Sequence, residues 1–314
     1  MTLLLQYTLI FASVLLLVAL GGCFAERSGV VNIGLEGIMV IGALGGALVM
    51  KFLPVSVGAL PMVAITIVAS ALFGMIFSLL LAVAAISFKA DQTITGTAMN
   101  MLATAGATVA VKAMNTAASN GNDVSSDIAY THAKDLFIVR LGEFEFNWFM
   151  LVAVICLAIS FVLLYKTRFG LRLRSCGEHP QAAASVGIDV LKMRYAGVLI
   201  SGLLGGLGGI VYITAGVSVW KFENGVAGFG FLAMAVMIFG GWHPLKIALA
   251  ALLFGFLRAL GNVYSGFDIL MVLNMPSVVY NMLPYIISLV VLAFASKKSR
   301  APKAAGIPYD KGTR

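Results

Sequence analysis

Long, continuous stretches of apolar residues dominate the chain, and short polar segments separate them. Because apolar residues do not alternate with polar ones, these stretches predict helices and exclude an outer-membrane β-barrel. With ~20 apolar residues needed for each membrane crossing, we predict an all-α fold, a polytopic transmembrane helical bundle of about eight to ten spans. The apolar runs lie at residues 3–23, 34–53, 61–87, 92–114, 148–165, 196–219, 228–243, 245–262 and 277–295.

Glycines interrupt several of these runs, and some runs are shorter than a full span, so broken or re-entrant helices are expected. Residues 34–87 fit either two spans or three, which leaves the side of the N-terminus open. The segments Gly34–Gly46 and Gly228–Gly241 resemble each other, since each starts at a glycine and ends on a glycine pair. Two explanations of this similarity remain open: the two halves of the chain are related, or apolar sequences resemble each other by chance.

Composition places the chain among integral membrane proteins. Apolar residues make up 61% of the sequence and charged residues 11%, whereas a soluble domain carries about 25% charged residues. The mean hydropathy is +1.01. A soluble enzyme, a secreted disulfide scaffold and a disordered chain are therefore excluded, and the lipid bilayer is the expected environment. We treat residues 1–314 as a single transmembrane domain.

The net charge of +8 arises from basic clusters that flank the apolar runs. Such clusters are typical of cytoplasmic loops, so they indicate a membrane and no nucleic acid partner. We expect a cytoplasmic loop at 166–195, a cytoplasmic tail at 296–314 and an external loop at 115–147, where acidic residues outnumber basic ones. The three cysteines are expected to be passive.

Motifs for catalysis are absent from the sequence. It has no H-E-x-x-H zinc motif, no G-x-S-x-G nucleophile motif and no G-x-x-x-x-G-K-[ST] phosphate loop. We expect no enzyme activity, no metal and no cofactor, and any ATP hydrolysis must belong to a partner chain. A stand-alone secondary transporter would need a buried charge to couple to an ion gradient, and no span centre clearly shows one.

The segment Glu26–Gly37 places acids, a base, an asparagine and glycines between two apolar runs. Asn32 is a suitable N-cap for the following helix, and Glu36 would lie in its first turn, where the helix dipole favours an acid. Two interpretations remain open here: an ordinary capped loop, or a re-entrant element beside a polar pathway. If Glu36 lies deep in the membrane, it should face a cavity or a partner.

A second polar segment begins the run at 92–114. Its hydroxyl and amide groups belong to Thr93, Thr95, Thr97 and Asn100. These groups would either hydrogen-bond a polar, uncharged ligand or hold helices together.

The segment Cys176–Asp189 predicts a short helix between two spans. Pro180 suits its first position, Gly187 its C-terminal cap, and Asp189 the N-cap of the next helix. A helix of about two turns, from Glu178 to Gly187, is too short to be stable alone. Its exposed alanines, Ala182–Ala184, would offer a smooth surface that docks into another protein.

These segments resemble the permease subunits of bacterial ABC importers in the ribose, branched-chain amino acid and nucleoside group. The string Gly177–Ala183, followed by Gly187-Ile188, is similar to the coupling motif of that group, although His179 stands where asparagine is usual. The strings Glu26–Met39, Lys89–Gly96 and Gly240–Pro244 look like the smaller of the two permeases in nucleoside (purine) importers.

The resemblance implies a multi-pass subunit in the bacterial cell membrane that forms the pathway for a neutral polar solute, with nucleosides favoured and ribose-like sugars as the alternative. It implies a heterodimer with a larger permease, two copies of an ATP-binding subunit and an extracytoplasmic substrate-binding lipoprotein. A membrane scaffold without transport is a further alternative. The expected pathway residues are Asn32, Glu36, Thr93, Thr95, Thr97 and Asn100, and the expected coupling residues are Glu178, His179, Pro180, Ala182, Ala183 and Gly187.

Overall fold

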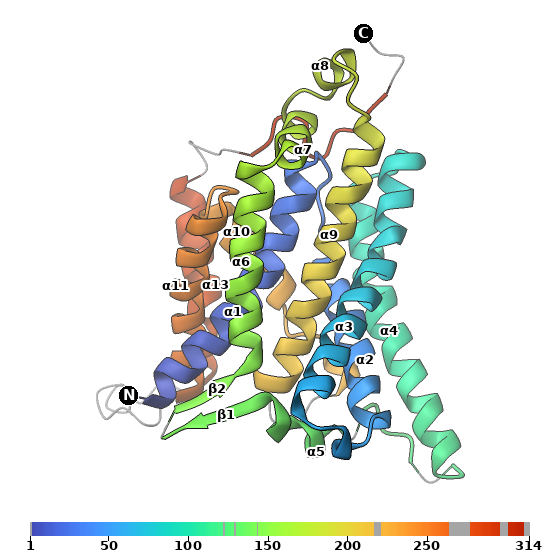
Figure 1. The fold of residues 1–314 in the computed structure, drawn as a ribbon, viewed down its shortest axis with the longest axis vertical. Coiled ribbons are helices and arrows are strands. Elements are labelled where there is room, and N and C mark those ends of the chain that lie inside the picture. Colours follow the sequence, from blue (N-terminus) through green and yellow to red (C-terminus); the bar gives the residue numbers. More distant parts are fainter. Residues whose placement is uncertain are drawn as a thin grey trace.

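The computed structural model describes residues 2–121, 123–128, 130–142, 144–216, 221–263, 277–295 and 301–310. Parts of two predicted segments lie outside these residues. They are residues 217–219 of the apolar run 196–219, and residues 296–300 and 311–314 of the predicted tail. Helices dominate the described part (Figure 1). They are α1 (Thr2–Arg27), α2 (Leu35–Phe52), α3 (Ala59–Ala82), α4 (Gln92–Ala118), α5 (Thr131–Lys134), α6 (Trp148–Lys166), α7 (Arg168–Glu178), α8 (Pro180–Ser185), α9 (Val190–Val211), α10 (Phe229–Phe239), α11 (Pro244–Val263) and α13 (Ser277–Ala295).

The only sheet among the described residues is an antiparallel hairpin of β1 (Ile138–Leu141) and β2 (Phe144–Asn147), with Ile138 opposite Asn147. Seven helices of the described part are long and apolar enough to cross a membrane, and two shorter apolar stretches lie at Phe229–Phe239 and Val278–Val290. The predicted all-α polytopic bundle is confirmed. Residues 34–87 form two of the spans, since α3 continues through a π-helical turn to Ser87.

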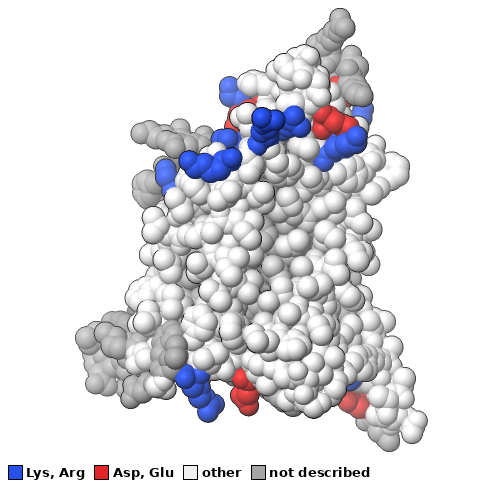
Figure 2. Space-filling view, viewed as in Figure 1, with Lys and Arg blue, Asp and Glu red and all other residues white. Residues whose placement is uncertain are grey.

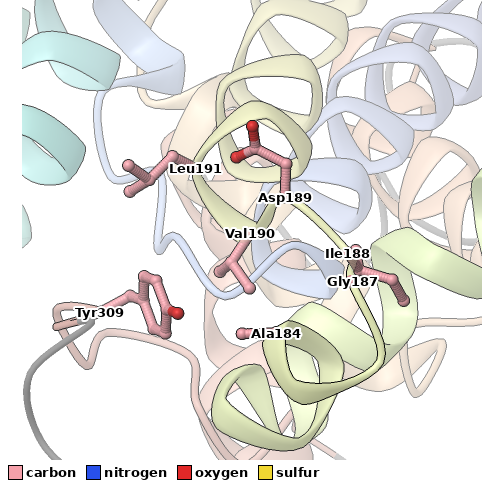
Figure 3. Close-up of a pocket in the computed structure, with 7 residues that line it drawn as sticks. All are labelled: Ala184, Gly187, Ile188, Asp189, Val190, Leu191 and Tyr309. Carbon is pink, nitrogen blue, oxygen red and sulfur yellow. The ribbon is translucent and has the colours of Figure 1, made fainter.

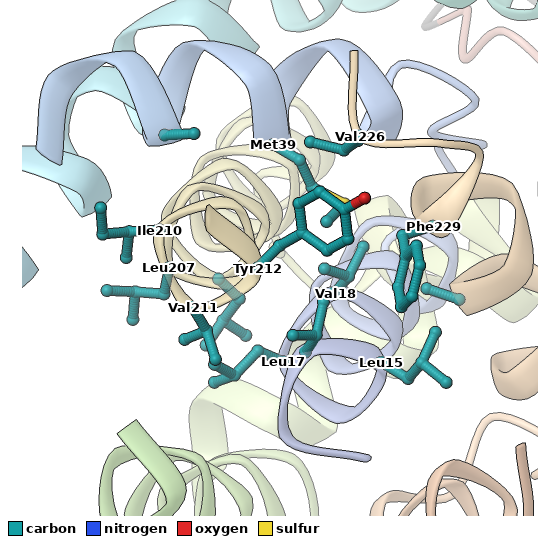
Figure 4. Packing of buried hydrophobic residues seen from close by; sticks show 14 of the residues in the cluster. Leu15, Leu17, Val18, Met39, Leu207, Ile210, Val211, Tyr212, Val226 and Phe229 are labelled. Carbon is teal, nitrogen blue, oxygen red and sulfur yellow. The ribbon is translucent and has the colours of Figure 1, made fainter. Parts of the chain in front are cut away.

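Helices α1 and α9 occupy the middle of the bundle, and the largest cluster of buried apolar side chains surrounds them. Figure 4 shows Tyr212 at the end of α9 packed among residues of α1, α2 and α10. Glycines let α9 approach its neighbours closely: a Cβ added at Gly42 of α2 would overlap the backbone of Gly206. This contact explains why small residues recur on these helices.

Two of the helices begin inside the bundle. Asn32, just before α2, contacts Ser201 of α9, which lies eleven residues after the start of that helix and therefore about 16 Å along it. Helix α10 starts beside Glu36 of α2 and ends at the C-terminal end of α1, where Arg27 contacts Trp242. Residues 28–34 therefore form a re-entrant loop, and the similar segments Gly34–Gly46 and Gly228–Gly241 both correspond to helices that start in the interior.

Charged residues gather at the two ends of the molecule (Figure 2). One end carries α7, α8 and the chain segment 301–310, where Ala304 N–H donates to Gly177 O. The opposite end carries the β1–β2 hairpin and the start of α1, joined by a 3.2 Å hydrogen bond from Gln6 to Glu145. The α1 N-terminus and the 115–147 region thus share one end, and the 166–195 region lies at the other.

Candidate translocation and coupling sites

The N-terminal ends of α2 and α10 meet at the carboxylate of Glu36. One carboxylate oxygen accepts the backbone N–H of Gly228 at 2.8 Å, and the other accepts that of Gly230 at 2.7 Å. Glu36 also lies in the first turn of α2, so its negative charge sits at the positive ends of two helix dipoles. These contacts replace water around the carboxylate. We name Glu36, Gly228 and Gly230 the interior junction.

Asn32 is buried next to this junction but does not cap α2. Its amide nitrogen donates to the Ser201 hydroxyl of α9 at 2.9 Å, and its side chain is 1% exposed. The N-cap residue of α2 is Gly34, and no side chain caps that helix end. The N-cap prediction was wrong because the helix begins two residues later than expected, and tertiary contacts turn Asn32 towards α9.

Asn100 of α4 supplies the contacts that a capping residue would have made. Its side-chain oxygen accepts the Gly37 N–H at 2.8 Å, and its amide nitrogen donates to Ile33 O at 3.0 Å. A Cβ added at Gly37 would come within 2.9 Å of Met99 O, so only glycine allows α4 this close. Asn32, Glu36 and Asn100 therefore meet around the start of α2.

The three predicted threonines lie apart from that junction. Thr93 and Thr97 are exposed on α4, and Thr95 is partly buried. The Thr97 hydroxyl donates to Thr93 O and the Thr95 hydroxyl to Asp91 O, so both hydroxyls keep a lone pair available to accept from another molecule. Thr93 and Thr97 share the outward face of α4 with large apolar side chains such as Ile94 and Met101. This face requires lipid or another protein to cover it.

Sequence reasoning missed a base close to the interior junction. Arg258 lies inside the α11 span, and its guanidinium is 5.6 Å from the ring centres of both Phe11 and Phe229. Tyr285 donates a 3.0 Å hydrogen bond to Ala227 O at the start of α10. Arg258 lies towards the end of α11 and not at its centre, so it does not test the expectation about span centres. A single arginine in the apolar run 245–262 was the available signal.

A second missed contact closes the opposite end of α10. The Trp242 indole N–H donates to the Glu26 carboxylate at 2.6 Å, and Arg27 donates to Trp242 O at 3.1 Å. Glu26 and Arg27 of the Glu26–Gly37 segment therefore hold the end of α10 against α1. Their partner lies more than 200 residues away, where no local pattern could identify it.

The predicted short helix is present at the basic end of the molecule as α8. Pro180 is its first residue, preceded by His179 as N-cap residue, and Gly187 follows it with a φ of 84°. Asp189 accepts the backbone N–H of Lys192 at 3.1 Å and caps α9. The predicted roles of Pro180, Gly187 and Asp189 in chain geometry therefore match the structure.

Two details of this prediction were wrong. Glu178 ends α7 instead of starting α8, and its carboxylate lies 3.7 Å from the Arg27 guanidinium. Ala182 is exposed, but Ala183 is 3% exposed and packs with Cys176, Val190 and Tyr309. A helix of six residues needs such an apolar anchor, because its own hydrogen bonds cannot hold it. Burial also raises the pKa of the Cys176 thiol, which favours its unreactive protonated form.

Comparison with known proteins identifies relatives over nearly the full chain. Residues 4–295 match the family described as branched-chain amino acid transport system / permease component. The chain is 42% identical over 311 residues to the guanosine ABC transporter permease protein NupQ of Bacillus subtilis, covering 98% of this chain and 96% of that protein.

Two further relatives come from Lactococcus lactis. The nucleoside ABC transporter permease protein NupC is 39% identical over 308 residues, covering 96% of this chain and 95% of NupC. The nucleoside ABC transporter permease protein NupB is 25% identical over 312 residues, covering 93% of this chain and 83% of NupB. The resemblance inferred from the coupling motif is therefore confirmed.

Proposed function

Because the chain belongs to the family of branched-chain amino acid transport system permease components, we propose that this ABC transporter permease forms part of the path by which nucleosides enter a bacterial cell. The observation that carries the proposal is the similarity, over nearly the whole chain, to guanosine and nucleoside permeases at 42% and 39% identity. A putative glucose permease of Haloferax volcanii is 30% identical over 82% of this chain, and it supports simple sugars as the alternative substrate class.

The complex that we propose contains a second, larger permease, two ATP-binding subunits and an extracytoplasmic lipoprotein that delivers the solute. Two of the relatives are nucleoside permeases of Lactococcus lactis, and this chain is more similar to NupC than to NupB. A NupB-like chain would then be the partner. The exposed apolar side chains of α3, α4 and α6 leave a large surface for that partner and for lipid.

The proposed path passes along the outward face of α4 and beside the interior junction. Thr93 and Thr97 offer hydroxyl groups there, and Thr95 lies partly buried at the side of this face. Asn32, Glu36 and Asn100 hold the starts of α2 and α10 in place. Backbone N–H groups stabilise the negative charge of Glu36 without removing it. A phosphorylated solute would meet a like charge beside the path, so neutral hydrogen-bonding solutes are favoured.

Energy for transport would enter at α8. The end of the molecule that bears α7 and α8 is rich in Lys and Arg, as cytoplasmic surfaces of membrane proteins are (Figure 2). We therefore place 166–195 and 296–314 in the cytoplasm and 115–147 outside. Glu178, His179, Ala182 and Gly187 would face the ATP-binding subunit. Pro180, which the sequence also suggested for this contact, is buried together with Ala183, and both residues fix α8 to the bundle.

The test is uptake by the complete transporter in liposomes that contain ATP and the receptor protein. We expect uptake of labelled guanosine, competition by other nucleosides, and little competition by ribose, glucose or guanosine monophosphate. Uptake should stop without ATP even when an ion gradient is present. Strong competition by ribose would favour the sugar alternative, and uptake driven by the gradient alone would contradict the proposal.

A further inference from the structure

The segment 301–310 lies across the end of the bundle that carries α8, and we name it the tail strap. Its backbone is tied to three elements far apart in the sequence. Ala304 N–H donates to Gly177 O of α7 at 2.8 Å, and Gly306 N–H donates to Gly29 O of the re-entrant loop at 3.3 Å. Arg194 of α9 donates to Ile307 O at 2.8 Å.

Side chains of the tail strap reach two more places. Tyr309 is 7% exposed and packs with Cys176, Ala183 and Val190, so it covers the anchor side of α8. Figure 3 shows the Tyr309 ring facing Ala184 and Val190 around a cavity of about 270 Å³. Asp310 lies 3.1 Å from the Lys89 ammonium group, just before α4 begins.

Arg194 makes the tail strap part of the interior packing. Its side chain is 1% exposed, and a guanidinium so deeply buried needs hydrogen-bond acceptors. Ile307 O is one such acceptor. A Cβ added at Gly29 would come within 2.9 Å of the Arg194 guanidinium, so Gly29, with a φ of 98°, lets the loop lie directly against it. Arg194 therefore holds the tail strap and the re-entrant loop together.

We propose that the tail strap is a coupling element: it transmits displacement of α8 to the re-entrant loop 28–34, and from there to the interior junction. Tyr309 packs against α8, and Gly306 is hydrogen-bonded to the loop. The loop contains Asn32 and leads directly to the start of α2. Tyr309 and Arg194 are positioning residues in this scheme. The inference rests on the proposed role of α8 as the contact with the ATP-binding subunit.

The decisive experiment measures guanosine uptake per ATP hydrolysed by the complete transporter in liposomes. Tyr309→Ala detaches the tail strap from α8, and we expect the ratio to fall about fivefold or more, as for loss of a coupling free energy between two sites. The ATP-binding subunit should still co-purify. Ile307→Ala is the matched control, because its exposed side chain is removed while the bonded carbonyl stays. A Tyr309→Ala ratio equal to that of the control overturns the proposal.

A charge exchange tests the same element without touching the core. Lys89→Asp and Asp310→Lys should each lower the ratio, and the double variant should restore it, since both side chains are about half exposed and the exchange keeps their opposite charges. The contact of the tail strap with the bundle is measured separately, by the rate of trypsin cleavage after Lys303. Faster cleavage with an unchanged ratio identifies the tail strap as packing only and contradicts the proposal.

Gly187→Val separates this inference from the proposed role of α8. If Gly187→Val lowers the uptake ratio or releases the ATP-binding subunit while Tyr309→Ala behaves as the Ile307→Ala control, the tail strap alone is refuted. If Gly187→Val also leaves uptake and hydrolysis unchanged, the role of α8 is refuted, and the proposal that depends on it is refuted as well.

Discussion

The interior junction and the C-terminal end of α8 at Gly187 both combine a short helix with a glycine of positive φ, but they are held together differently. Gly228, with a φ of 79°, starts α10 in the bundle interior, whereas Gly187, with a φ of 84°, ends α8 at the surface. In the interior, backbone N–H groups have only the protein as partner, and Glu36 is that partner. At the surface, the C-terminal end of α8 closes with local backbone hydrogen bonds at Gly187 and Ile188, while the Ala183 anchor holds the body of the helix. Buried helix ends therefore depend on one distant side chain, and exposed ends depend on the residue that forms them.

The largest effect should come from Glu36→Leu, which removes the acceptor from two buried N–H groups. We expect a loss of about 3 kcal/mol or more in the free energy of unfolding, because each unsatisfied group costs about 1–3 kcal/mol. Uptake should fall even in the fraction that assembles. Unfolding in detergent measures the loss of stability, and guanosine uptake in liposomes measures the loss of transport. Glu36→Gln, which keeps one carbonyl oxygen, is the matched control, and equal stability of the two variants would show that the junction does not depend on this acceptor.

Gly187→Val should have a smaller effect on stability and a specific effect on coupling. No atom lies within 4 Å of the position a Cβ would take, so the cost is the left-handed backbone alone, about 1–2 kcal/mol. We expect normal membrane insertion with loss of substrate-stimulated ATP hydrolysis. Gly187→Asn is the control, since asparagine tolerates this conformation. If both variants show normal substrate-stimulated ATP hydrolysis, the turn at Gly187 does not orient α8.

Thr97→Val tests the outward face of α4, where stability and transport should separate. The side chain is exposed, so the free energy of unfolding should change by less than about 0.5 kcal/mol. If the hydroxyl bonds the solute, the KM for uptake should rise about threefold to tenfold. Thr97→Ser keeps the hydroxyl and serves as control. An unchanged KM in the valine variant would remove Thr97 from the path.

The smallest effect concerns pH at His243, which lies between α10 and α11. Burial, assisted by Lys246 and Arg27, holds the pKa of His243 below its ordinary value. As pH falls below about 6.5, the unfolded chain takes up this proton before the folded protein does, so stability decreases. We expect the thermal midpoint to fall on acidification and His243→Asn to reduce that fall. Identical pH profiles of the two proteins would contradict this.

Local patterns in the sequence determined the membrane-spanning architecture and the geometry of α8. Apolar runs located the helices, because a lipid environment leaves few other ways to satisfy the backbone. Pro180, Gly187 and Asp189 defined a helix start, a helix end and a cap, since each acts within a few residues of its position. The coupling motif also indicated the family, which the comparison confirmed.

Tertiary structure alone decided which polar groups meet in the interior. Glu36 contacts Gly228 across 192 residues, Asn32 contacts Ser201 instead of capping α2, and the tail strap lies across α8. Nothing local distinguishes an asparagine that caps its own helix from one that bonds another helix. Chain packing makes that choice, because a buried polar group needs a hydrogen-bond partner in the protein, and the fold determines which partner lies within reach.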